Sequence, residues 1–275
     1  MQSKSDWLRR PWPLTEIFAV ANLAFLAADV FIAHSVNRFE QPAEWVPVAF
    51  SIVAPVVLVI AAAMRRHAQR ASTLLGLLVG WCALGVGIAG MLFHLGSHFF
   101  QQESVRNLVY TAPFIAPLAY SGLGLLLIMN RMVPAESREW ALWVIVLALG
   151  GFAGNFGLTL ADHAQNAFFN PIEWVAVAAS AVAVGFLAVL VFRPGDRFLL
   201  RSTLAVLALE FVVGILGFAL HIGADFALPG RSLWEQFLYG APLFAPLLFP
   251  NLALLAAIGV WALWPGITAD SAAAA

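Results

Sequence analysis

Histidine and glutamate residues recur in this sequence at a spacing that suits a metal site. Two stretches, HSVNRFEQPAEW (His34–Trp45) and HAQNAFFNPIEW (His163–Trp174), agree at His, Asn, Phe, Pro, Glu and Trp when they are aligned 129 residues apart. Two further histidines, His94 and His221, occupy matching positions in the pentapeptides HLGSH and HIGAD. The sequence therefore contains the same set of ionisable groups twice.

The chemistry available to these side chains is metal coordination. Neutral imidazole and carboxylate suit iron, zinc, manganese and copper, whereas an iron–sulfur cluster or a soft Cu(I) site uses thiolates, which the pattern lacks. The predicted ligands are His34, Glu44, His94, His163, Glu173 and His221, with His98 and Asp225 as further candidates. Side chains expected to orient these ligands are Asn37, Asn166, Tyr110, Tyr239 and Arg38. We expect iron in the site, with copper or zinc as alternatives.

A structural interpretation competes with this one. A single histidine at the end of a membrane helix is usually an interfacial side chain without a special role. Duplication accounts for the resemblance of the two copies, but not for the retention of the ionisable groups while the apolar residues around them diverged. Ionisable groups at a membrane are unfavourable enough to indicate function. For His98 and Asp225, which differ between the copies, a loop hydrogen bond is the alternative.

Composition places the chain in a bilayer. Of 275 residues, 62% are hydrophobic and 11% charged, far more apolar than a soluble domain. A helix needs about 20 apolar residues to cross the hydrocarbon core. Eight segments meet this length, and we predict an all-α polytopic membrane protein with spans at Thr15–His34, Trp45–Met64, Ser72–His94, Leu108–Asn130, Trp140–Leu160, Trp174–Phe192, Ser202–His221 and Phe237–Trp264. Proline residues are expected to kink the fourth and eighth spans, at Pro113, Pro117, Pro242, Pro246 and Pro250.

The spans fall into two similar halves. LVYTAPFIAPL (Leu108–Leu118) and FLYGAPLFAPL (Phe237–Leu247) again match 129 residues apart. The sequence thus predicts two four-helix repeats, residues 1–133 and 134–275. Since each has an even number of spans, the repeats should run in parallel about a pseudo-two-fold axis along the membrane normal.

Basic residues predict the orientation of the chain. Eleven of the fourteen Lys and Arg residues lie before the first span or in the loops on the same side as the termini. The positive-inside rule therefore predicts a multi-pass protein of the bacterial inner membrane with both termini in the cytoplasm. The predicted ligands then lie near the periplasmic face, where the two repeats would bring four imidazoles and two carboxylates into one dinuclear site.

Three functions are compatible with such a site. The first is a membrane-bound oxidoreductase that receives electrons from a quinol or a periplasmic electron carrier. The second is a b-type cytochrome, in which two histidines hold haem b. The third is a divalent metal transporter. Nucleic acid is not an expected partner, because the net charge is −1 and the basic residues are scattered.

Overall fold

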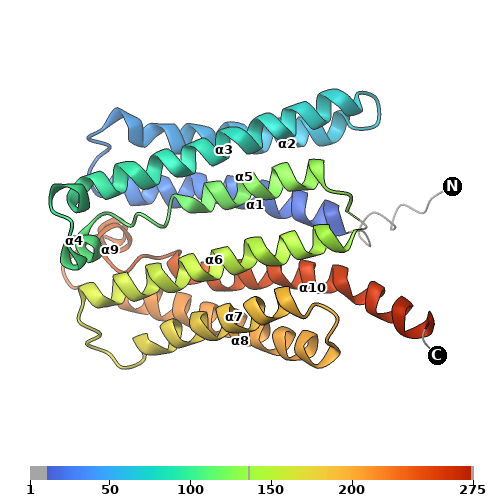
Figure 1. The fold of residues 1–275 in the computed structure, drawn as a ribbon. Coiled ribbons are helices and arrows are strands. Elements are labelled where there is room, and N and C mark those ends of the chain that lie inside the picture. Colours follow the sequence, from blue (N-terminus) through green and yellow to red (C-terminus); the bar gives the residue numbers. More distant parts are fainter. Residues whose placement is uncertain (1–10, 136, 274–275) are drawn as a thin grey trace.

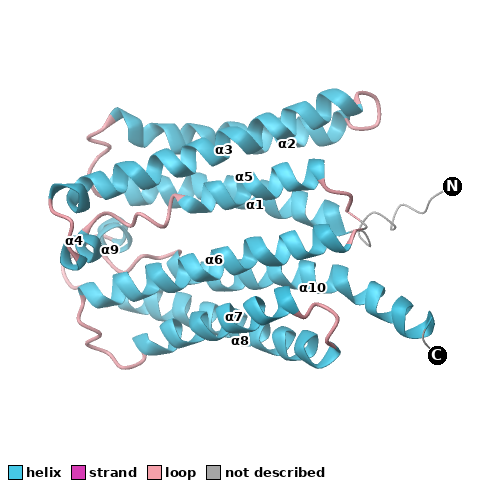
Figure 2. Ribbon diagram, viewed as in Figure 1, coloured by secondary structure: helices cyan, strands magenta, loops and turns pink. Residues whose placement is uncertain are grey.

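The computed structural model describes residues 11–135 and 137–273, and in this part of the chain all regular structure is helical. The main helices are α1 (Pro11–Ser35), α2 (Trp45–Met64), α3 (Gln69–His98), α5 (Leu118–Met132), α6 (Arg138–Gln165), α7 (Glu173–Phe192), α8 (Arg197–Phe226) and α10 (Leu248–Ala273). Shorter helices are η2 (Pro42–Glu44), η3 (Phe99–Gln101), α4 (Val105–Tyr110), α9 (Leu233–Tyr239) and η4 (Ala245–Leu247). Figures 1 and 2 show the main helices side by side, with α4 and α9 at one end of the bundle.

Seven helices in the described ranges are long and apolar enough to cross a membrane. The chain is therefore a multi-pass membrane protein, as its composition predicts. The remaining main helix, α5, has 15 residues, about 22 Å at 1.5 Å per residue, which is short of the hydrocarbon core of about 30 Å. The structure thus differs from the eight full-length spans expected from the sequence.

The difference arises at the prolines of the fourth and eighth predicted spans. These spans are interrupted rather than kinked: residues 111–117 separate α4 from α5, and residues 240–247 separate α9 from α10 and contain η4. Pro113 and Pro117 lie in the first interruption, and Pro242 and Pro246 in the second. Each proline removes an N–H donor and its ring clashes with the preceding turn. Two prolines four residues apart therefore end the helix.

The helices pack in two groups of four. In the first unit, α1 contacts α2 and α5, and α3 contacts α2 and α5; in the second unit, α6 contacts α7 and α10, and α8 contacts α7 and α10. The units meet where α5 contacts α6 and α1 contacts α10. Polar contacts between them include one between Asn22 and Asn251, one from Trp140 Nε1 to Asn130 Oδ1 at 2.9 Å, and one from Gln165 Nε2 to the Val109 carbonyl at 2.8 Å.

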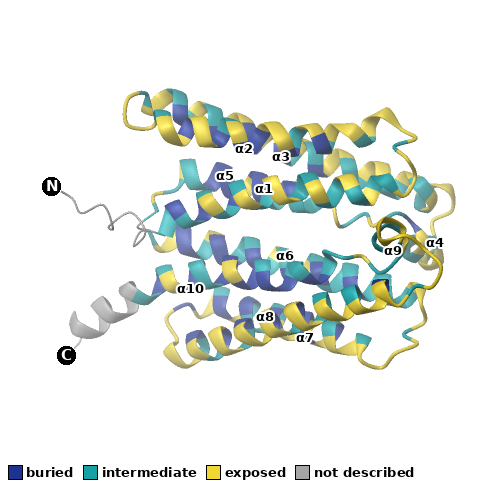
Figure 3. Ribbon diagram, turned by 180° about the vertical axis from the view of Figure 1, so that it is seen from behind, coloured by how far each residue is buried: buried dark blue, intermediate teal, exposed yellow. Residues whose placement is uncertain are grey.

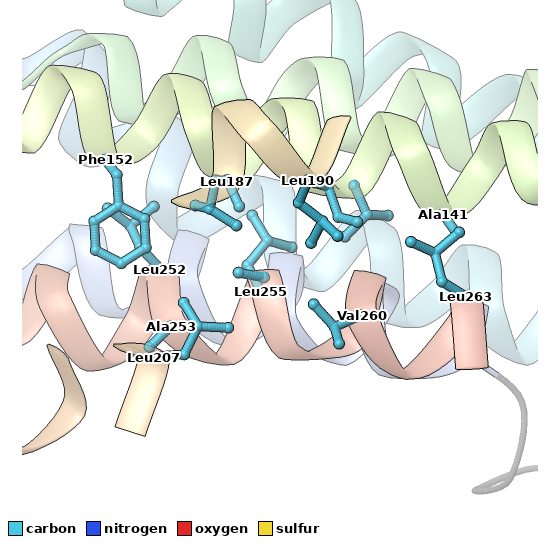
Figure 4. Packing of buried hydrophobic residues seen from close by; sticks show 14 of the residues in the cluster. Ala141, Phe152, Leu187, Leu190, Leu207, Leu252, Ala253, Leu255, Val260 and Leu263 are labelled. Carbon is cyan, nitrogen blue, oxygen red and sulfur yellow. The ribbon is translucent and has the colours of Figure 1, made fainter. Parts of the chain in front are cut away.

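Side-chain burial follows this packing. The second unit has a continuous apolar core that includes Leu187, Leu190 and Val260 (Figure 4). On the outer surface, α2 exposes Ile52, Val56 and other large apolar side chains, and exposed residues cover the outward faces of the helices (Figure 3). Apolar side chains are compatible with lipid on these faces, while the backbone hydrogen bonds are made within the helices.

Glycines hold the interrupted segments close to the neighbouring helices. A Cβ added at Gly87 of α3 would lie 2.8 Å from the carbonyl oxygen of Pro117, and one at Gly214 of α8 would lie 2.7 Å from that of Pro246. A proline of the interruption is thus packed against a glycine of the neighbouring helix in both units. Small residues allow helix backbones to approach this closely in membranes.

The contact between α3 and α5 provides a test of this packing. A Cβ at Gly124 would lie 2.5 Å from the carbonyl oxygen of Gly80, whereas nothing lies within 4 Å of a Cβ at Gly122. We expect Gly124→Ala to lower the free energy of unfolding by about 1–3 kcal/mol, the usual effect of overpacking. Gly122→Ala should have no destabilising effect, because alanine favours the helix. Thermal unfolding of both proteins in detergent measures this difference, and equal stability of the two variants would contradict the assigned contact.

Candidate metal centre

The predicted ligands lie in two groups at the same kind of place in each unit. The first group, defined as His34, Glu44 and His94, comes from the end of α1, from η2 and from the last turns of α3. The second group, defined as His163, Glu173 and His221, comes from the end of α6, the start of α7 and the last turns of α8. Each group therefore combines two histidines and one carboxylate from three helical elements.

A sharp loop places each glutamate beside its histidine. After α1, Arg38 and Phe39 have φ values of 57° and 55°, and after α6, Ala167 and Phe168 have values of 56° and 50°. Residues other than glycine rarely adopt this left-handed region. Here it ends the helix and reverses the chain within a few residues. The backbone N–H of Phe39 donates to the His34 carbonyl at 3.2 Å, and that of Phe168 donates to the His163 carbonyl at 3.1 Å.

Stacked aromatic rings fix the far side of the loop. Phe39 stacks on Trp45 with ring centroids 4.0 Å apart and an interplanar angle of 18°, and Phe168 stacks on Trp174 at 4.0 Å and 13°. The phenylalanine and tryptophan shared by the two duplicated stretches therefore have a structural role. They hold the glutamate, which precedes the tryptophan, at the turn.

In the first group, the rings of His34 and His94 lie with their centroids 6.1 Å apart. The carboxylate of Glu44 and the ring of His94 both interact electrostatically with His34. Asn37 Nδ2 donates to Glu44 Oε1 at 2.8 Å, as expected for a side chain that orients the carboxylate. Two buried atoms, His34 Nδ1 and Glu44 Oε2, have no hydrogen-bond partner.

The second group has the same composition with a closer contact. His163 Nδ1 lies 3.5 Å from Glu173 Oε2, and the ring of His221 interacts electrostatically with His163. Both side chains are largely covered, with 22% of the His163 side chain and 10% of the Glu173 side chain exposed. Glu173 Oε2 accepts no hydrogen bond. Buried carboxylate oxygens usually find a donor or a cation.

The interruption in each unit fixes the orientation of the second histidine. His94 Nδ1 lies 2.9 Å from the carbonyl oxygen of Pro113, and His221 Nδ1 lies 2.7 Å from that of Pro242. A carbonyl can only accept, so Nδ1 donates its proton and, in the neutral ring, Nε2 keeps its lone pair. A backbone carbonyl bound to the opposite ring nitrogen is the usual partner of a metal-binding histidine.

Asp225 binds the backbone of the interruption in the second unit through Oδ1, and its Oδ2 is buried without a hydrogen-bond partner. Its Oδ1 accepts a hydrogen bond from the backbone N–H of Ala241 at 2.6 Å, and the residue is fully buried. In the first unit the equivalent backbone N–H, that of Ala112, donates to Ser97 Oγ at 3.0 Å. The loop hydrogen bond considered as an alternative for Asp225 is therefore present.

The other predicted residues lie apart from the groups. His98 is exposed, with Nδ1 3.4 Å from Ser97 Oγ. Tyr110 and Tyr239 are 53% and 47% exposed, respectively. Arg38 is exposed, and Asn166 is the exposed C-cap residue of α6. Among the described residues, none of these five side chains makes a hydrogen bond or ion pair with a member of either group.

Three ligand candidates lie at the same end of each unit. In residues 11–135 and 137–264, no hydrogen bond or ion pair connects the two groups, and no three His, Cys, Asp or Glu side chains are arranged as a formed metal site. The single shared site expected from the sequence stays a prediction. The carbonyls of Pro113 and Pro242 were not among the predicted site residues, although the repeated Ala-Pro pairs mark their positions.

Comparison with known proteins provides no further assignment. The chain matches no protein-family model, no curated protein and no solved structure.

The hydrogen bond of Asp225 generates a prediction that does not depend on metal. Asp225→Ala leaves the buried N–H of Ala241 without an acceptor, and we expect a loss of about 1–3 kcal/mol in the free energy of unfolding. Asp225→Asn keeps an acceptor oxygen and should retain most of the stability. His98→Ala, at the equivalent position of the first unit, serves as the control and should unfold like the parent protein. Unfolding in detergent without added metal is the measurement, and an Asp225→Ala protein as stable as the His98→Ala protein would refute the assigned role.

Proposed function

We propose that the protein is an integral membrane metalloprotein with one metal ion in each four-helix unit. His34, Glu44 and His94 would bind the first ion, and His163, Glu173 and His221 the second. The observation that carries this proposal is the same grouping of two imidazoles and a carboxylate in both units, with a backbone carbonyl on Nδ1 of the second histidine.

The separation of the two rings in the first group is compatible with this proposal. Two imidazoles that share one ion, with metal–nitrogen bonds of about 2.1 Å, have ring centroids roughly 5 to 6.5 Å apart. The separation between His34 and His94 is 6.1 Å. His34 Nδ1, Glu44 Oε2 and Glu173 Oε2 are buried and without hydrogen-bond partners. A cation bound to these atoms would satisfy them and draw the side chains inward.

The ligand set favours redox chemistry. Two histidines and one carboxylate leave coordination positions open and are typical of non-haem iron that activates oxygen. We therefore propose iron as the metal, with copper or zinc as alternatives, and a membrane-bound oxidoreductase as the function. The protein would contribute the geometry: Pro113 and Pro242 fix the second histidine, and Asn37 holds one carboxylate oxygen. A quinol or a periplasmic electron carrier would supply electrons.

We further propose that the two units are repeats related by a pseudo-two-fold axis along the membrane normal. The matching contacts of Gly87 with Pro117 and of Gly214 with Pro246 support this relation. The loops rich in arginine lie at the opposite end of the bundle from both groups. By the positive-inside rule, the groups would then lie near the periplasmic face of a bacterial inner membrane, with both termini in the cytoplasm.

A divalent metal transporter is the second candidate. Helices interrupted at corresponding positions of two repeats are characteristic of transporter binding sites, and here both interruptions carry a carbonyl that contacts a candidate ligand, His94 or His221. In that function the same groups would bind the transported ion reversibly.

Metal content tests the proposal directly. We expect one ion per unit in protein purified without chelator, so His34→Ala should remove about half of the bound metal. The double variant His34→Ala/His163→Ala should contain none. His67→Ala, which changes a histidine at the other end of the bundle, is the control and should keep the full amount. Elemental analysis of the four proteins gives the ratios.

Optical and transport measurements then separate the functions. Two non-haem ions with quinol oxidation support the oxidoreductase, and reversible binding with uptake into vesicles supports the transporter. A Soret band would instead indicate haem b held by the histidines. Metal-free parent protein, or variants with unchanged metal content, would contradict the proposed centres.

A further inference from the structure

The first unit contains a cavity at the opposite end from the metal-ligand candidates. Its volume is about 350 Å³, and it lies between the start of α1, the connection from α2 to α3, and the end of α5. The side chains that matter here are Trp12, Glu16, Arg65, Gln69, Thr73 and Arg131. This volume is within the range of small-ligand sites, which is about 300–1,000 Å³.

The charges in the cavity are not balanced. Arg131 donates to both carboxylate oxygens of Glu16, at 2.8 and 3.1 Å, so these two residues neutralise each other. Arg65 is the remaining charge, and its guanidinium lies over the ring of Trp12, 3.6 Å from the centroid. The described residues place no ion-pair partner on Arg65. The lined space therefore has a net charge of about +1.

The electrostatic environment of Arg65 also favours an anion. Desolvation by neighbouring atoms lowers the pKa of Arg65 from its usual value, Glu16 partly opposes this effect, and Arg131 adds to it. An anion in the cavity would compensate both the desolvation and the repulsion between the two guanidinium groups. Trp12 orients the Arg65 side chain so that its edge donors remain available for a planar, bidentate contact.

The second unit shows that the fold does not require a polar cavity here. At the positions 129 residues later, Ile145 replaces Glu16 and Val260 replaces Arg131. Both are fully buried and belong to the apolar core that also contains Leu187 and Leu190. Figure 4 shows Val260 in this core. Charged side chains inside a membrane bundle are unfavourable unless they serve a function. The first unit thus has polar residues at two positions where apolar residues pack well in the second unit.

We propose that this cavity binds a phosphate group, with Arg65 as the principal contact and Gln69 and Thr73 as additional donors. The phosphate could come from the headgroup of an anionic phospholipid or from a soluble phosphomonoester, and the two share the same recognition chemistry. Basic pockets between membrane helices on the side of the basic loops are characteristic of anionic headgroup sites. The site is separate from the proposed metal centres and does not depend on them.

The test uses the full-length protein in detergent, analysed by native mass spectrometry with added phosphatidylglycerol or phosphatidylcholine. We expect the parent protein to retain phosphatidylglycerol in preference to phosphatidylcholine. Arg65→Gln should weaken this binding by about tenfold or more, which corresponds to the loss of one charge-assisted contact. Arg66→Gln is the matched control, because Arg66 is the adjacent arginine, is exposed like Arg65, and does not line the cavity.

A second variant tests the cavity without changing its charge. Thr73→Phe should fill part of the space and reduce binding while Arg65 remains in place. Competition with glycerol 3-phosphate identifies the source: displacement of the lipid indicates a site that accepts soluble phosphomonoesters, and no displacement indicates a lipid headgroup site. Both outcomes support the proposal. Equal binding by the Arg65→Gln and Arg66→Gln proteins, together with unaffected binding by Thr73→Phe, would overturn it. So would a parent protein that neither prefers phosphatidylglycerol over phosphatidylcholine nor binds glycerol 3-phosphate.

Discussion

The need to satisfy backbone hydrogen bonds at the two interrupted helices underlies the rest of the structure. The prolines that end these helices leave carbonyl and amide groups without partners inside the helix, and a membrane offers no water to replace them. Side chains from α3 and α8 supply the partners: His94 and His221 bind the carbonyls of Pro113 and Pro242, and Asp225 binds the amide of Ala241. Since the histidines donate through Nδ1, the interaction that completes the fold also leaves a lone pair on Nε2 of each neutral ring.

The two units share one end and differ at the other. At the end with the interruptions, the duplicated loops have the same left-handed residues and the same stacked rings. At the opposite end, Glu16 and Arg131 of the first unit correspond to Ile145 and Val260 of the second. The two units therefore have similar local structure where histidine and glutamate meet, while the first unit has a polar cavity at the opposite end and the second an apolar core.

Sequence reasoning identified the candidate ligands better than it identified their partners. The spacing of His34 and Glu44 was visible because a short loop determines it, and the structure brings them together as expected. The role of Asp225 was open, because a carboxylate four residues after a histidine suits either a ligand or a loop contact. The fold shows the loop contact, since the amide of Ala241 lies 16 residues away in the chain and 2.6 Å from the Asp225 carboxylate in space.

The sequence by itself determined the class of the protein, most of its membrane helices and the pairing of His with Glu at the ends of those helices. These features depend on composition and on contacts within about a dozen residues. Only the tertiary structure decided which helix brings a second histidine near each His–Glu pair, α3 in the first unit and α8 in the second, because that depends on how distant helices pack. It also decided that the prolines interrupt the fourth and eighth predicted spans, just before α5 and α10, rather than kink longer helices. That outcome requires side chains from distant segments to satisfy the freed backbone groups, and no local pattern encodes them.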